Sequence, residues 1–332
     1  MRHAINAPAD TRPRMLTGAY GRAGSAVLFL AAAAALWLGL GASTAATVMR
    51  PERHPQLRWA ACNRNAHSVA VSTFHPLSDH AAAALVTHEP ETRRDNARSY
   101  TLDGHQYQAA NDYVPTLAQV RAFRQARSSS GQTNVAFNPY YQYVDGRDGL
   151  RHPSTDDLIQ WAAHKWGIPE NWLRAEYVHE TYWNQFMLGD ATQVSGAWYG
   201  KYRPADRIPG THSVYQSLGI TQVRWAPGGA LHPGTEPLRW LSTAFNIDYQ
   251  AATVRFYYDN PQRTRSSWGD GSYTPCQTWN SIGGWYSPYP WQNSGQASYA
   301  DAVKRILAQR DWESSGFVSW APSSLPRGLH FR

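Results

Sequence analysis

Glu180 is the residue of this chain whose setting most favours chemistry. It lies near the end of residues 172–184, a segment in which nearly every direction around a helical axis is apolar and only Glu176 and Glu180 carry carboxyl groups. Burial in such surroundings disfavours the charged form of a carboxyl group and raises its pKa, so a glutamic acid can stay protonated near neutral pH. The segment therefore predicts acid catalysis by Glu180. Glu176, one turn earlier on the same helical face, is a candidate second carboxylate.

A helix, a tight turn and a second helix are predicted from Ser154 onwards, and they would position this carboxyl group. Ser154 followed three residues later by Asp157 is typical of a helix N-terminus. Apolar residues then recur at helical spacing. Gly167 suits the left-handed residue that ends a helix, and Pro169 suits the first position of the next one. Glu180 is thus expected near the end of the second helix.

The C-terminal part of the chain predicts further helices joined by long loops. Residues 190–234 are rich in glycine and are expected to form loops, whereas residues 242–258 have the apolar spacing of a long helix. Residues 276–291 are predicted to form an aromatic, glycine-bearing loop, and a last helix is expected over residues 299–312. A mainly α domain with long loops is therefore predicted over residues 150–315.

The N-terminal part predicts export. Arginines precede an apolar run within residues 25–46, and small residues at its end fit a cleavable signal peptide over residues 1–46. The same run is long enough to act as an uncleaved membrane anchor. Residues 47–145 are interrupted by prolines and are expected to form an irregular extension or linker with one short helix over 116–127, while residues 316–332 form a C-terminal tail. The protein is therefore predicted to be secreted or located in the cell wall, unless the apolar run anchors it to the membrane.

The composition restricts the partners that we expect. A formal net charge of +7 favours anionic surroundings such as a cell-wall surface. Lys and Arg are not clustered as in nucleic-acid readers, so we expect no nucleic-acid partner, and membrane contact only through an uncleaved anchor. The 15 Trp and 19 Tyr residues offer faces that can stack on sugar rings as well as fill a core. Cys62 and Cys276 could form a disulfide in an exported protein, and two separate thiols fit the sequence equally well.

Several short motifs follow one another along the predicted domain. The sequence Glu-Thr-Tyr-Trp-Asn at 180–184 is followed by Ser-Leu-Gly-Ile-Thr-Gln at 217–222, by Asn246, by an aromatic segment at 279–289 and by Tyr299. Their residue types and their order resemble the motifs of the superfamily of soluble lytic transglycosylases and goose-type lysozymes, over roughly half of the chain. The fourth motif departs from the Tyr-Asn-Gly-Gly pattern of that superfamily, so it does not identify a single tyrosine for the site.

The resemblance implies a lysozyme-like fold and a specific function for Glu180. This residue would be the single catalytic acid and base that cleaves the bond between N-acetylmuramic acid and N-acetylglucosamine in bacterial peptidoglycan. In a lytic transglycosylase the same carboxylate then takes the proton of the muramic acid 6-hydroxyl, which closes a 1,6-anhydro ring without water, cofactor or metal ion. The residues that the resemblance implies for binding the glycan strand are Ser217, Gln222, Asn246, Trp285, Tyr286 and Tyr289.

Two other functions fit the same residues. Asp190 could activate a water molecule, which would make the enzyme a lysozyme-type hydrolase, or it could cap a loop. A non-catalytic wall-binding or scaffold protein could also keep such a domain and its aromatic residues, although it would not need Glu180. A zinc peptidase is excluded, because a helix that binds zinc through His179 would need a second histidine at the position of Trp183.

Overall fold

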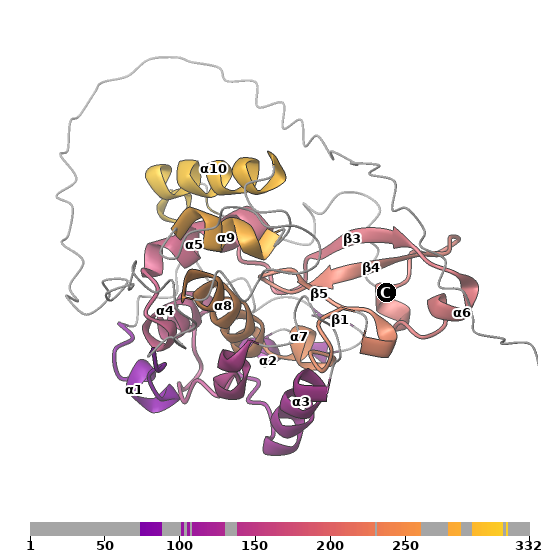
Figure 1. The fold of residues 1–332 in the computed structure, drawn as a ribbon, viewed down its shortest axis with the longest axis horizontal. Helices are drawn as coiled ribbons and strands as arrows, with labels where there is room; N and C mark the ends of the chain where they lie inside the picture. The colour runs from indigo at the N-terminus through magenta and orange to yellow at the C-terminus, as the bar shows by residue number, and fades with distance from the viewer. Residues whose placement is uncertain are drawn as a thin grey trace, which may run out of the picture. The chain divides into compact units, whose positions relative to one another are not determined.

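The structure, a computed structural model, describes residues 74–87, 101–102, 105–106, 108–129, 138–229, 231–259, 278–286, 294–314 and 317 (Figure 1). These residues are mainly helical, which confirms the predicted fold class. The predicted signal peptide or anchor, Cys62, Cys276, Tyr289 and all of the tail except residue 317 lie outside the described residues, so statements about them stay predictions. Among the helices that are described, none is both long and apolar enough to cross a membrane.

The predicted helix pair is present as α4 (Thr155–Trp166) and α5 (Glu170–Thr181). The Ser154 hydroxyl accepts a hydrogen bond from the backbone N–H of Asp157 at 3.1 Å, and the Asp157 carboxylate accepts one from the backbone N–H of Ser154 at 2.9 Å. Such a capping box satisfies backbone donors that a helix N-terminus leaves free. Gly167 ends α4 with a left-handed φ of 59°. Local sequence signals therefore predicted both ends of α4 correctly.

α8 (Thr243–Asp259) is the central helix of the domain, and nearly all of its residues are buried. α4 and α9 (Thr278–Tyr286) both pack against α8, and α10 (Ser294–Gln309) packs on α5 and α9 (Figure 1). The helix predicted over residues 242–258 is confirmed as α8. The predicted C-terminal helix is confirmed as α10. Glu180 is thus carried by a helix with neighbours on several sides.

α9 corrects the prediction of an aromatic loop in this part of the chain. Gly283 and Gly284 favoured a loop, since glycine lowers helix stability. Both glycines are buried in the structure, and a Cβ atom at Gly283 would lie 3.2 Å from the backbone O of Gln296 in α10. The absence of a side chain therefore lets α9 and α10 approach closely, and this packing outweighs the low helix propensity.

A three-stranded antiparallel sheet replaces part of the loops predicted over residues 190–234. Its order is β3 (Leu188–Gln193), β4 (Ser213–Leu218) and β5 (Val223–Arg224). The sequence did not reveal β3 because its residues are exposed or half-buried, so no apolar alternation marks it. Short helical segments in the connections are α6 (Gly196–Tyr199), η3 (Pro204–Asp206), η4 (Pro227–Gly229) and α7 (Leu238–Leu241), and η6 (Asp311–Glu313) follows α10.

The described parts of the segment predicted as an irregular extension, residues 47–145, contribute to the core. Ala82, Phe123 and Val144 belong to the same hydrophobic cluster as α4 and α8, so residue 145 does not separate a loose part from a packed part. The helix predicted over 116–127 forms as α3. The elements described here are α1 (Asp79–Ala83), β1 (Thr101–Leu102), β2 (His105–Gln106), α2 (Gln108–Asn111), α3 (Leu117–Ser129) and η2 (Pro139–Tyr143).

A buried ammonium group ties α1 to the central helices. Lys165 of α4 is 2% exposed, and its Nζ lies 2.6 Å from Asp79 Oδ1 and 2.9 Å from Asp248 Oδ2 of α8. Asp248 also accepts hydrogen bonds from Trp166 Nε1 at 2.7 Å and from the backbone N–H of Asp145 at 3.0 Å. A buried cation needs such partners because it loses its hydration on folding. The cluster therefore holds α1, α4 and α8 together.

Replacing Asp248 by asparagine tests this ion cluster. Asp248→Asn leaves the Lys165 ammonium buried with one carboxylate fewer, so we expect the free energy of unfolding to fall by on the order of 3 kcal/mol. Asp301→Asn is the matched control, because Asp301 pairs with Lys304 at 2.9 Å on the surface. Exposed pairs of this kind contribute about 0.5 kcal/mol. Urea denaturation measures both variants, and equal losses would contradict the importance of the buried cluster.

Candidate active site

Glu180 lies in the last turn of α5, which ends where Tyr182 adopts a left-handed conformation with φ 53°. Part of the Glu180 side chain is exposed, so the residue is neither sealed in the interior nor free in solvent. Its Oε1 accepts a hydrogen bond from the hydroxyl of Tyr299 in α10 at 2.5 Å. Trp285 of α9 lies nearby, and its indole N–H donates to the backbone O of Thr221 at 2.9 Å. Side chains from three helices therefore meet at this group.

The pKa of the Glu180 carboxyl is raised to about 8. Burial is the main cause, because it disfavours the charged form, and the negative charge of Asp190 acts in the same direction. The hydrogen bond from Tyr299 favours the ionised form and offsets only part of the increase. Glu180 is therefore mostly protonated at pH 7, which is the state that a general acid needs.

Glu176, the candidate second carboxylate, is fully buried one turn before Glu180. The hydroxyl of Tyr299 lies 3.2 Å from its Oε1. Burial raises the pKa of Glu176 well above its usual range, and the charge of Glu180 adds to this, while Gln250 and Tyr299 act in the opposite direction. Glu176 thus has no access to a substrate, but it shares a hydroxyl group with Glu180.

Asp190, the other candidate carboxylate, belongs to β3 and has an exposed side chain. The Ser217 hydroxyl of β4 donates a hydrogen bond to its Oδ2, and Arg224 Nε lies 4.0 Å from the same oxygen. The negative charge of Asp190 contributes to the raised pKa of Glu180. Ser217, which the motif resemblance implies as a substrate contact, therefore orients Asp190 in this structure.

The turn between β4 and β5 is held against the end of α5 and against α8 by three buried polar side chains. The Thr181 hydroxyl donates to the backbone O of Ile220 at 2.9 Å, and Gln185 Oε1 accepts from the backbone N–H of Ile220 at 3.1 Å. Asn246 Oδ1 accepts from the backbone N–H and the hydroxyl of Thr221 at 2.9 and 2.7 Å. Residues from three motifs are thus brought together, and the turn has a fixed place relative to α5.

Two residues that the motif resemblance implies for substrate binding use their amide groups within the chain. Asn246 is fully buried, and its Nδ2 donates to two backbone carbonyl groups at 3.2 and 2.7 Å. Gln222 Nε2 donates to the backbone O of Met187 at 2.9 Å and of Gly219 at 3.0 Å. Asn246 therefore supports the turn, and Gln222 has only its carbonyl oxygen left to offer a sugar.

An aromatic group surrounds the hydroxyl that contacts Glu180. Tyr286 is 59% exposed and stacks on Tyr299, with the ring centroids 5.4 Å apart. The ring of His179 meets Tyr299 edge-on at a centroid distance of 4.8 Å, as expected for a histidine that faces a neighbour. Burial and the charge of Arg305 lower the pKa of His179, so it is neutral at pH 7. The stacked pair gives the site an exposed aromatic face.

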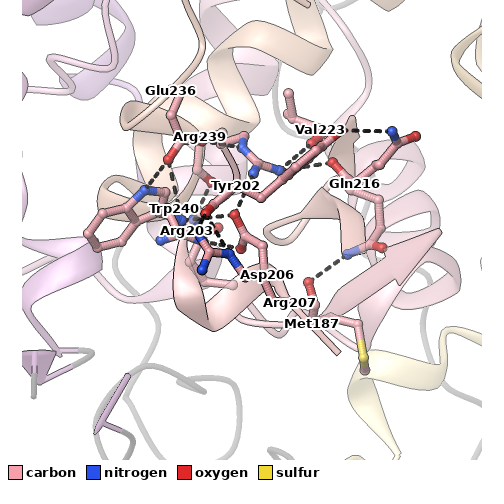
Figure 2. A network of polar contacts seen from close by, with 12 residues as sticks. Met187, Tyr202, Arg203, Asp206, Arg207, Gln216, Val223, Glu236, Arg239 and Trp240 are labelled. Atoms are coloured by element: carbon pink, nitrogen blue, oxygen red, sulfur yellow. Dashed lines mark hydrogen bonds and ion pairs between the residues drawn. The ribbon is translucent and has the colours of Figure 1, made fainter. Parts of the chain in front are cut away.

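A buried arginine fixes the strands next to the site (Figure 2). Arg239 of α7 is fully buried, and its Nη1 donates to the backbone O of Gln216 in β4 at 3.0 Å and of Val223 in β5 at 3.3 Å. Its Nε donates to Glu236 at 2.6 Å, and its Nη2 donates to Asp206 at 3.4 Å. The planar guanidinium group can reach all four partners at once because its five N–H donors point in fixed directions. The network therefore fixes β4 and β5 relative to α7.

Tyr299, Gln185 and Arg239 are residues of this region that sequence reasoning did not assign to the site. The place of Tyr299 in the motif order was a signal that it belongs there. No local pattern marks the other two, because Gln185 and Arg239 bond to backbone groups 35 and 23 residues away along the chain. Such contacts become visible only in three dimensions.

Comparisons of the chain with protein-family models, curated proteins and solved structures find no match. Function is therefore inferred from the motifs and from the geometry at Glu180. Within the described part of the chain, no group of three or more His, Cys, Asp or Glu side chains could hold a metal ion.

Gly219 provides a test of the turn beside Glu180. Its φ is +94°, and an added Cβ atom would lie 2.1 Å from Asn246 Nδ2 and 2.9 Å from the backbone O of Arg239. Gly210 is a matched control, since its φ is +74° and nothing lies within 4 Å of its added Cβ. An alanine costs about 1–2 kcal/mol of left-handed strain at either position. Gly219→Ala should lose about 1–3 kcal/mol more through disturbed buried hydrogen bonds. Denaturant unfolding gives both values, and two equally stable variants would show that the turn is not tightly held.

Proposed function

We propose that this protein cleaves the glycan strands of peptidoglycan as a lytic transglycosylase, with Glu180 as the only catalytic acid and base. One observation carries the proposal, namely the state of the Glu180 carboxyl. The residue is partly exposed, its carboxyl group is hydrogen-bonded to the Tyr299 hydroxyl, and the pKa of about 8 keeps that group protonated at neutral pH. The geometry supports acid catalysis in general, and the motif resemblance supports peptidoglycan as the substrate.

The hydrogen bond from Tyr299 selects the oxygen of Glu180 that acts. Because Oε1 accepts the tyrosine hydroxyl at 2.5 Å, the acidic proton is held on Oε2. Oε2 gives this proton to the glycosidic oxygen while the bond from that oxygen to C1 of the muramic acid breaks. The carboxylate then takes the proton of the 6-hydroxyl, whose oxygen bonds to C1 and closes the anhydro ring. Glu180 is protonated again at the end, and no water is consumed.

Groups beside Glu180 support the binding of a sugar chain. Tyr286 is exposed and stacked on Tyr299, and an aromatic face of this kind can pack against the apolar face of a sugar ring. Gln222 keeps a carbonyl oxygen for a hydroxyl or amide donor. The net charge of +7 favours approach to an anionic wall. These features fit a long, neutral to anionic glycan better than a small charged substrate.

Asp190 favours a second candidate function, which is hydrolysis of the same bond. Its carboxylate is exposed, it accepts a hydrogen bond from the Ser217 hydroxyl, and its charge influences Glu180. A carboxylate with these properties can act as general base for water, as in glycosidases that use two carboxylates. Hydrolysis leaves a reducing end on the glycan, whereas transglycosylation leaves an anhydro end, so the products distinguish the two reactions.

Glu180→Gln tests acid catalysis. The amide keeps the size of the side chain but has no acidic proton, so release of muropeptides from purified sacculi should fall by at least about 100-fold. Glu313→Gln is the control, because it changes an exposed glutamate and should leave digestion unaltered. Mass spectrometry of the wild-type digest should find anhydro ends. Sacculi that wild-type protein binds but leaves intact would refute the proposal and favour a scaffold protein.

Asp190→Asn separates transglycosylation from hydrolysis. In a transglycosylase the anhydro product persists, and loss of the Asp190 charge lowers the pKa of Glu180. The rate should then fall at pH 8, where less Glu180 is protonated, and change little at pH 6. In a hydrolase the missing base should lower the rate at both pH values by about 100-fold. Initial rates and product masses at the two pH values measure this, and loss of reducing-end products would establish the hydrolase instead.

A further inference from the structure

Glu176 and Glu180 share a single hydroxyl group. The Tyr299 hydroxyl lies 2.5 Å from Glu180 Oε1 and 3.2 Å from Glu176 Oε1. A phenolic hydroxyl has one proton to donate and lone pairs that accept. It can therefore donate to only one of the two carboxyl groups at a time. The other contact is favourable only if that carboxyl group is itself protonated and donates to the tyrosine oxygen.

The surroundings of Glu176 determine which carboxyl group keeps its proton. Glu176 is fully buried, whereas Glu180 is partly exposed. The groups that act on Glu176 are Glu180 and Tyr177 of α5, Gln250 of α8 and Tyr299 of α10, and none of them is a cation. A buried carboxylate without a cationic partner is strongly disfavoured. Glu176 therefore stays neutral, and Glu180 is the group that changes charge.

The charged groups nearest to the site are Asp190, the Arg224 of β5 that lies 4.0 Å from it, and the Arg305 of α10 that acts on His179. Tyr299 of α10 donates a hydrogen bond to Glu180, the indole N–H of Trp285 is taken by the backbone O of Thr221, and Asp190 of β3 contributes a negative charge. His179 contacts the ring of Tyr299 and is itself neutral. The orientation of the Tyr299 proton is therefore the main feature that can stabilise an ionised Glu180.

We infer that Glu176 is a positioning residue for the proposed reaction: its protonated carboxyl donates to the Tyr299 oxygen and thereby turns the tyrosine proton towards Glu180 Oε1. This inference rests on the proposed function. The three groups form a chain of donors that runs from Glu176 through Tyr299 to Glu180, and each hydrogen bond in such a chain polarises the next. The chain keeps the acidic proton on Oε2 before the acid step. It also stabilises the carboxylate that must act as base afterwards.

Glu176→Leu and Glu176→Gln form a matched pair of variants. Leucine removes the donor without leaving a buried charge, whereas the glutamine amide can still donate to the Tyr299 oxygen. The wild-type rate of sacculus digestion should fall as pH rises through about 8, because the protonated form of Glu180 is active. This fall in rate is the alkaline limb of the pH profile. Glu176→Leu should move the midpoint of the alkaline limb to higher pH by roughly half a pH unit to one pH unit, since Tyr299 then stabilises ionised Glu180 less well. It should also lower kcat by about tenfold with little change in KM.

Glu176→Gln should have a kcat and an alkaline limb close to those of the wild type. Tyr299→Phe should move the alkaline limb to higher pH at least as far as Glu176→Leu does. Titration of the 13C-labelled Glu180 carboxyl by NMR should rank the pKa of Glu180 in the variants in the same order, and it requires no turnover. Thermal unfolding of each variant shows whether it is folded. A folded Glu176→Leu variant with an unchanged alkaline limb and an unchanged kcat would overturn the inference, because Glu176 would then only fill space in the core.

A downward shift of the limb in both Glu176 variants would overturn the inference in a different way. It would mean that Glu176 is ionised in the wild type, since removal of a nearby negative charge lowers the pKa of Glu180. Failure of the proposed function is recognised separately, because wild-type protein would then leave sacculi intact. The NMR titrations would still report on the proton arrangement in that case.

Discussion

A carboxyl group that has to stay neutral until a substrate arrives can have only uncharged or negative groups around it, and this constraint shapes the region around Glu180. The middle of α5, residues 173–178, is buried, and the carboxyl groups of Glu176 and Glu180 interrupt its apolar surroundings. A cation at either position would stabilise the charged form and lower the pKa. The structure provides the hydroxyl group of Tyr299 instead, and both carboxyl groups share it.

Cations are used elsewhere in the domain, where they fix the framework of the site. Lys165 joins α1, α4 and α8 through buried carboxylates, and Arg239 joins α7 to β4 and β5 through carboxylates and backbone carbonyl groups. Each cation has anionic partners close by, which compensates for its lost hydration. The charged clusters therefore hold the helices and the sheet in place, while Arg224 and Arg305, the cations nearest to the site, act on Asp190 and His179 and form no ion pair with Glu180. This separation allows a rigid framework and a raised pKa in the same small domain.

The parts of the fold that the sequence predicted correctly are those whose signals are local. The capping box at Ser154, the left-handed Gly167 and the apolar spacing of α8 depend on residues within a few positions of one another. The elements that were missed depend on distant partners. α9 is a helix despite Gly283 and Gly284 because it packs closely on α10, and β3 is a strand because β4 pairs with it. The predicted extension joins the core for the same reason.

For the site, the sequence by itself determined that a carboxyl group would lie at the end of a buried helix, because apolar periodicity fixes both the helix and its burial. The order of the motifs also predicted which residues to look for near Glu180. Only the tertiary structure decided what those residues do. Asn246 supports a turn, Ser217 orients Asp190, and Tyr299 contacts two carboxyl groups. Hydrogen bonds between side chains that are far apart in the chain depend on distances of a few tenths of an ångström, and no spacing along a sequence specifies them.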